Sequence, residues 1–145
     1  EAELVEAYEK LFREPSFSRD GRKLVYTFHG GEYHSDHQSV ARAACKARAA
    51  LPGETSVHLF GVNQTVPFGS LYDYTRLAET KKRALACFES QLAYLDFASK
   101  VMYRDQAATV NVEMPEVTHA ELILAVRVED WPRHIEQCEA WLGKQ

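Results

Sequence analysis

One stretch of the sequence constrains the fold more than any other: a strand pattern that leads through a turn-rich loop into a helix pattern. Lys23 to Phe28 (KLVYTF) is β-branched and aromatic, which predicts a strand. His29 to His37 follows as a polar loop with two adjacent glycines, and Ser39 to Leu51 contains the strong helix former VARAACKARAAL. We therefore expect the loop to lie at the carboxyl end of a strand, where open α/β sheets bind their ligands.

The rest of the chain continues the alternation of helices and strands. Helix patterns cover Leu4 to Phe12, Ala78 to Tyr94 and Trp131 to Leu142, and strand patterns cover Ser56 to Phe60 and Glu121 to Val128. The last strand pattern is nearly continuous in apolar residues, which is consistent with a buried position in a sheet. This alternation predicts an α/β fold, with a Rossmann-like layered sheet flanked by helices. A chain of 145 residues fits a single domain, which we place at 1–145.

Turn and capping residues separate these elements. Ser16 to Gly21 is predicted to be a polar loop, and Pro52-Gly53 is predicted to stop the alanine-rich helix. Asp130 is expected to be the N-cap of the final helix, with Pro132 in its first turn.

Composition and charge narrow the class of protein. The chain is 46% hydrophobic and 26% charged, as in ordinary globular domains, and its net charge of −4 gives no indication of a nucleic-acid or anionic-membrane partner. No apolar run approaches the roughly 20 residues of a membrane span. Three widely spaced cysteines without a CxxC motif are typical of reduced thiols, so we expect a cytoplasmic protein.

The residues with the clearest chemistry are His34, Asp36 and His37 in the loop after the first strand. Imidazole and carboxylate groups are zinc ligands, and a carboxylate also orients a neighbouring imidazole through a hydrogen bond. The alternative is that both histidines face solvent and that Asp36 caps the following helix. This segment supplies one or two metal ligands, whereas a metal site needs at least three protein ligands.

These residues resemble a known family. Glu32 to His37 (EYHSDH), followed by Ser39 to Ala43 (SVARA), looks like the second zinc motif of the LmbE/PIG-L N-deacetylases, His-Pro-Asp-His before a helix rich in alanine and arginine. Tyr72 to Thr75 (YDYT), then Glu79 to Leu85 (ETKKRAL) and Ser90-Gln91, resembles a second block of the same family. Two ordered blocks are more specific than either block alone.

The resemblance implies a zinc-dependent amide hydrolase that removes an acetyl group from an N-acetylated amino sugar such as N-acetylglucosamine or its conjugates. It implies that His37 is a zinc ligand, that His34 stabilises the oxyanion or acts as an acid, and that Asp36 orients the site. Zinc in such an enzyme polarises the acetyl carbonyl and activates water.

Three further residues are candidates for contact with the substrate. His29 lies at the end of the first strand and either lines a pocket or packs locally. Tyr33 belongs to the motif that resembles the family. His119 precedes the late strand, whose end borders the site in that family.

The family's first motif, His-Pro-Asp-Asp-Glu, supplies two zinc ligands and the catalytic base. This chain contains no His-Pro and no Asp-Asp dipeptide, so it resembles the C-terminal portion of such an enzyme. We expect the chain alone to be inactive and an N-terminal segment or a second polypeptide to complete the site. The alternative is a non-catalytic carbohydrate-binding or interaction module derived from the same fold.

Overall fold

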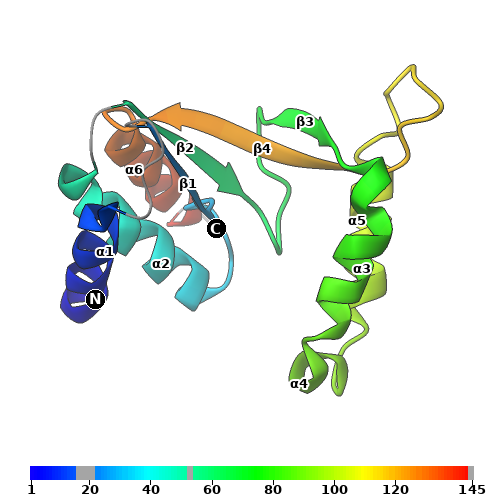
Figure 1. Ribbon diagram of the computed structural model, residues 1–145, viewed down its shortest axis with the longest axis horizontal. Coiled ribbons are helices and arrows are strands. Elements are labelled where there is room, and N and C mark those ends of the chain that lie inside the picture. The colour runs from blue at the N-terminus through cyan, green and yellow to red at the C-terminus, as the bar shows by residue number, and fades with distance from the viewer. Residues whose placement is uncertain (16–21, 52–53, 144–145) are drawn as a thin grey trace. The chain divides into compact units, whose positions relative to one another are not determined.

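The computed structural model describes residues 1–15, 22–51, 54–143 (Figure 1). Ser16 to Gly21 and Pro52-Gly53, where the sequence predicts a loop and a helix stop, lie outside the described residues. The chain divides into two compact units. The first unit contains Glu1–Gly69 and Ile123–Gln145, and the second unit contains Ser70–Leu122.

A mixed sheet forms the framework. β1 (Arg22–Phe28) pairs in parallel with β2 (Glu54–Phe60), and β2 pairs in antiparallel fashion with β4 (Ala120–Arg127). The strand order is β1-β2-β4-β3, with β3 formed by Ser70–Asp73. The register places Phe28 opposite Phe60. Because these two residues end their parallel strands, the loops that follow β1 and β2 begin side by side.

Helices of the first unit pack against one face of this sheet. They are α1 (Ala2–Arg13), α2 (Ser35–Lys46) with the short η2 (Ala47–Ala50), and α6 (Trp131–Leu142). Val57 and Leu59 share one face of β2, and the buried residues of the helices pack against them in a single cluster. The helix residues in this cluster include Phe12 of α1, Ala41, Ala44 and Cys45 of α2, and Trp131 and Ile135 of α6. The expected α/β character is therefore confirmed as a four-stranded mixed sheet with helices against it.

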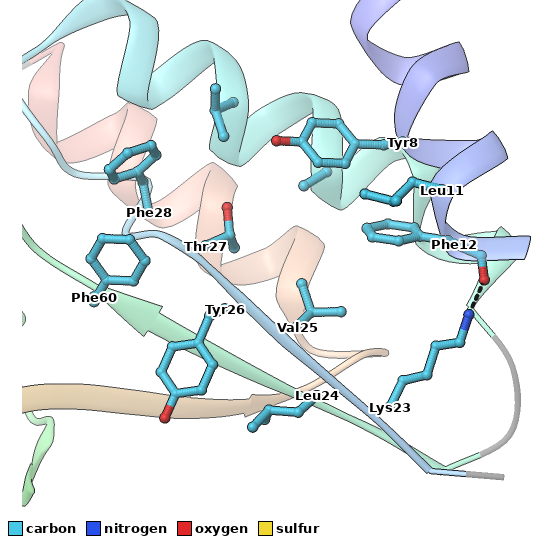
Figure 2. A pocket seen from close by; sticks show the side chains of 12 residues that line it. Tyr8, Leu11, Phe12, Lys23, Leu24, Val25, Tyr26, Thr27, Phe28 and Phe60 are labelled. Atoms are coloured by element: carbon cyan, nitrogen blue, oxygen red, sulfur yellow. Dashed lines mark hydrogen bonds between the residues drawn. The ribbon is translucent and has the colours of Figure 1, made fainter. Parts of the chain in front are cut away.

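A buried lysine joins α1 to β1. Lys23 is 8% exposed, and its Nζ donates hydrogen bonds to the carbonyl oxygens of Phe12 and Glu14. These carbonyls lie at the end of α1, where backbone acceptors lack partners within the helix. Lys23 lies at one end of an apolar cleft of about 300 Å³. Figure 2 shows the hydrogen bond from Lys23 to Phe12 there, with Phe28 and Phe60 at the other end of the cleft.

The last strand and helix depart from the sequence expectation in two details. Ala120 and Ile123 of β4 are buried, but Ala125 and Arg127 are exposed, so the strand is buried only in part. Asp130 occupies the N-cap position of α6, yet its side chain makes no capping hydrogen bond. It accepts a hydrogen bond of 2.6 Å from Arg127 instead, because the guanidinium is a charged donor within reach.

The second unit contains η3 (Thr75–Leu77), α3 (Ala78–Ala86), α4 (Glu89–Leu92) and α5 (Phe97–Ala107). The single helix expected from Ala78 to Tyr94 is wrong, since Phe88 leaves helical geometry with φ −85° and ψ 54° between α3 and α4. α5 was not predicted from the sequence. Its start carries a recognisable signal, because the Asp96 carboxylate accepts a capping hydrogen bond of 3.2 Å from the Ser99 N–H.

A buried carboxylate organises the interior of the second unit. Asp105 is 1% exposed and accepts hydrogen bonds from Lys81, from Arg104 and from the Tyr74 hydroxyl. Lys81 also pairs with Glu121. Burial and the hydrogen bond to the Asp105 carboxylate raise the pKa of Tyr74 far above its ordinary value. Lys81 therefore serves as the counter-ion of a buried acid.

None of the helices in the described part of the chain combines the length and the apolar composition needed to cross a membrane.

Candidate functional site

The loop between β1 and α2 carries the histidines singled out in the sequence. β1 ends at Phe28 and α2 begins at Ser35, so His34 is the N-cap residue of α2 and His37 lies in its first turn. Gly30 lies against α6 in this loop. A Cβ at Gly30 would lie 2.9 Å from Cδ1 of Ile135, the end of a flexible side chain, and 3.4 Å from Cβ of Cys138.

Glu32 is the most deeply buried charged residue of this loop, with 0% exposure. Its Oε1 accepts hydrogen bonds from the backbone N–H groups of Val62 (2.8 Å) and Gln64 (3.3 Å). The Asn63 N–H lies 3.2 and 3.1 Å from the two carboxylate oxygens. Successive amides of the loop after β2 thus surround the carboxylate, which compensates for its removal from water. Glu32 therefore ties the loop after β1 to the loop after β2.

Gly61 allows the second loop to wrap around Glu32. A Cβ at this position would lie 2.0 Å from the carbonyl oxygen of Gln64, a separation that no relaxation of side chains relieves. The side chain of Gln64 also donates a hydrogen bond to the Gly31 carbonyl, so the two loops are joined at a second point. The sequence around Gly61 is thus adapted to close the backbone over a buried anion.

His37 is held in a fixed orientation by two neighbours. Its Nδ1 lies 2.9 Å from Glu32 Oε2, and its ring stacks on Phe28 with centroids 4.0 Å apart and planes inclined by 5°. A carboxylate can only accept a hydrogen bond, so Nδ1 carries the proton. The lone pair of a neutral His37 imidazole is then on Nε2. Side-chain exposure of 22% leaves this ring partly open to solvent.

His34 has the opposite arrangement. Its Nδ1 accepts a hydrogen bond of 3.2 Å from the Asp36 N–H, which caps α2 and places the proton of a neutral ring on Nε2. Its ring stacks on that of His37 with centroids 4.9 Å apart. The stacked pair therefore presents one N–H donor, from His34, and one nitrogen lone pair, from His37.

Asp36 contacts His34 and not His37. Its Oδ2 lies 3.9 Å from His34 Nδ1, and its side chain is 84% exposed in the first turn of α2. The carboxylate that orients His37 is Glu32, which the sequence analysis quoted only as part of the motif. The helix cap is His34 rather than Asp36, which was the alternative considered from the sequence.

The other predicted contact residues lie in different surroundings. Tyr33, which precedes His34 in the sequence, is 58% exposed. His119 belongs to the second unit, where its ring nitrogens lie 3.0 Å from the Thr118 hydroxyl and 3.2 Å from Gln106 Nε2. His29 is 5% exposed, so it is a buried residue rather than an open loop residue.

His29 belongs to a second cluster, together with His134 and Cys138 of α6. One ligand atom from each of these residues lies within 4.8 Å of the other two. The ring of His29 packs edge-on against that of His134, with centroids 4.8 Å apart. This cluster was not predicted from the sequence. The signal was the spacing of His134 and Cys138, because residues four apart share one face of a helix.

Burial sets the protonation states of this cluster. Desolvation lowers the pKa of His134 to about 4, aided by the neighbouring His29, and it also lowers the pKa of His29. Desolvation raises the pKa of the Cys138 thiol to about 11. Near neutral pH the cluster therefore consists of two neutral imidazoles and a protonated thiol. It borders a cleft of about 600 Å³ lined also by Phe68, which is 97% exposed.

Searches against family models, curated proteins and solved structures found no match for this chain.

Proposed function

We propose that this chain carries the histidine pair of a zinc-dependent amide hydrolase that removes the acetyl group from an N-acetylated amino sugar such as N-acetylglucosamine. The motif resemblance suggests the reaction and the substrate class, and it favours a Rossmann-like arrangement of the mixed sheet. The three free thiols are consistent with a reducing, cytoplasmic location.

The complementary protonation of His34 and His37 carries the proposal. Glu32 fixes the His37 proton on Nδ1, which leaves Nε2 as a ligand for zinc. The Asp36 N–H fixes the His34 proton on Nε2, which makes His34 a hydrogen-bond donor to the oxyanion of the tetrahedral intermediate. When bound, zinc supplies polarisation of the acetyl carbonyl and an activated water.

His37 is one of at least three protein ligands that such a site requires. Within residues 1–15, 22–51 and 54–143, His29, His134 and Cys138 form the one group of three with metal-ligand spacing, and His37 is not part of it. The proposal therefore assigns the remaining ligands to a segment or a second polypeptide outside these residues. A non-catalytic sugar-binding module is the competing function.

Native mass spectrometry with zinc present and then chelated tests the proposal. We expect the assembly with a second polypeptide to hold one zinc more than the lone chain, and this zinc should be lost on chelation. His37→Ala should bind one zinc fewer than the unsubstituted protein. His34→Ala should bind the same amount of zinc but release acetate from N-acetylglucosamine roughly 100-fold more slowly.

His58→Ala is the matched control, because His58 lies on β2 beside Tyr26 and not beside the histidine pair. It should retain both zinc and turnover. An ion bound by the cluster of Cys138 would be present in every variant, so the difference in zinc content between two variants does not depend on it. If His37→Ala binds as much zinc as the unsubstituted protein, the ligand assignment is wrong. A lone chain that gains no zinc through His37 would instead support the binding module.

A further inference from the structure

The cluster of His29, His134 and Cys138 has the dimensions of a metal site. Cys138 Sγ lies 3.5 Å from His134 Nε2 and 3.8 Å from His29 Nε2. Zinc binds thiolate sulfur at about 2.3 Å and imidazole nitrogen at about 2.0 Å, so two such ligands at a tetrahedral angle lie roughly 3.5 Å apart. The two distances from the sulfur to the imidazole nitrogens are therefore already close to those between the ligands of a tetrahedral zinc ion.

Two structural features bring the three ligand atoms together. His134 and Cys138 are four residues apart on α6, so their side chains project from the same helix face. His29 approaches them from the end of β1, and Gly30, which follows it, lies against α6. A Cβ at Gly30 would lie 3.4 Å from Cys138 Cβ and 2.9 Å from Ile135 Cδ1, so the end of the strand and the helix are in close contact here.

We propose that His29 Nε2, His134 Nε2 and Cys138 Sγ form a binding site for a divalent ion of borderline softness such as zinc. Thiolate and imidazole are the ligand types that such ions prefer. All three residues also line the cleft of about 600 Å³, which leaves a fourth coordination position for water or a small ligand. This site is independent of His37 and of the proposed hydrolase.

Protons must move when the ion binds. His29 Nδ1 accepts a hydrogen bond of 3.1 Å from the Gly31 N–H, so its proton in the metal-free protein is on Nε2, facing Cys138. Binding transfers this proton to Nδ1 and releases the thiol proton of Cys138 to solvent, because a metal-bound thiol is deprotonated. The hydrogen bond from Gly31 to His29 is then lost.

Cobalt(II) titration of the chelator-treated, reduced protein tests the site. A cobalt–thiolate bond gives a charge-transfer absorption in the near ultraviolet, which the His37 site cannot give through nitrogen ligands. We expect this band to saturate at one equivalent, and excess zinc to abolish it. The Gly31 amide resonance should shift over the same titration, since its acceptor is removed.

Variants separate the cluster from other cobalt sites. Cys138→Ser and His134→Gln should lose at least ten-fold in cobalt affinity, and Cys138→Ser should lose the band entirely. Cys87→Ser removes an exposed thiol elsewhere and should keep the band, as should His37→Ala. Far-ultraviolet circular dichroism of each variant reports whether it folds. Absence of the band in the folded, unsubstituted protein, or its survival in Cys138→Ser, would overturn the proposal.

Discussion

The interaction between Glu32 and His37 makes a prediction that separates orientation of the imidazole from simple packing. Glu32→Gln conserves the shape of the side chain but replaces one carboxylate oxygen by an NH₂ group. The remaining oxygen can still accept from the amides of Val62 and Gln64. The NH₂ group faces His37 Nδ1 and can only donate to it. We therefore expect the His37 proton to move to Nε2, where it blocks metal ligation.

The expected cost in stability follows from the hydrogen bonds at Glu32. In Glu32→Gln the bonds from the loop amides persist but lose their charge-assisted character, so we expect a decrease in the free energy of unfolding of about 2 kcal/mol. Glu32→Ala leaves those amides and His37 without their acceptor. Each unsatisfied donor costs about 1–3 kcal/mol, and partial access of water limits the sum, so about 4 kcal/mol is expected.

The assay combines urea unfolding with nitrogen-15 NMR of the imidazole groups, which distinguishes protonated from unprotonated ring nitrogens. In the unsubstituted protein His37 should carry its proton on Nδ1 and His34 on Nε2. In Glu32→Gln the His37 proton should appear on Nε2, while His34, which accepts from the Asp36 N–H, should stay unchanged.

Glu3→Gln on the exposed side of α1 is the matched control; it should lower the free energy of unfolding by less than about 1 kcal/mol, since Glu3 lies in the first turn of the helix, and it should leave the tautomers unchanged. A His37 proton that stays on Nδ1 in folded Glu32→Gln would contradict this prediction. A cost of less than about 1 kcal/mol in Glu32→Ala would also contradict it, because the backbone amides of residues 62–64 would then not depend on the carboxylate.

Two further predictions follow from burial and close contact. Gly61→Ala should lower the free energy of unfolding, measured in urea, by more than about 2 kcal/mol, because the added Cβ would meet the Gln64 carbonyl. It should also shift the His37 resonances. An unchanged midpoint of urea unfolding would contradict this prediction. In the metal-free protein a thiol-specific alkylating reagent should modify exposed Cys87 first. Cys45 is buried, and burial raises the pKa of its thiol to about 11, so it should react at neutral pH only when the protein unfolds. Mass spectrometry of the alkylated peptides gives the order in which the two thiols react.

The strand, loop and helix around the histidines could be predicted because local preferences and tertiary packing agree there. The β-branched run became β1, and the alanine-rich run became α2, whose small residues Ala41 and Ala44 fit closely into the core. The second unit shows where local preference is insufficient. The helix-forming composition from Ala78 to Tyr94 gave no indication of the break at Phe88, whose backbone leaves helical geometry.

The candidate site could be predicted in its residue types but not in its partners. The sequence singled out His34 and His37 as candidates, and the resemblance implied that Asp36, which lies between them, is the orienting carboxylate. The structure selects Glu32 because the backbone amides that stabilise it come from Val62 to Gln64, far along the chain. A carboxylate with no such amides, such as Asp36, stays in solvent. Sequence distance alone gives no indication of this difference.

The same long-range packing explains why two candidate sites share one short loop. Gly31 donates its N–H to His29 and accepts from the side chain of Gln64, so it connects the cluster on α6 to the loop that encloses Glu32. Its neighbour Glu32 then orients His37. The N–H and the carbonyl of Gly31 belong to two different peptide planes, and the φ and ψ angles between these planes can rotate. Loss of the acceptor of the Gly31 N–H, which the proposed ion requires, is therefore compatible with unchanged hydrogen bonds to Glu32 and an unchanged orientation of His37.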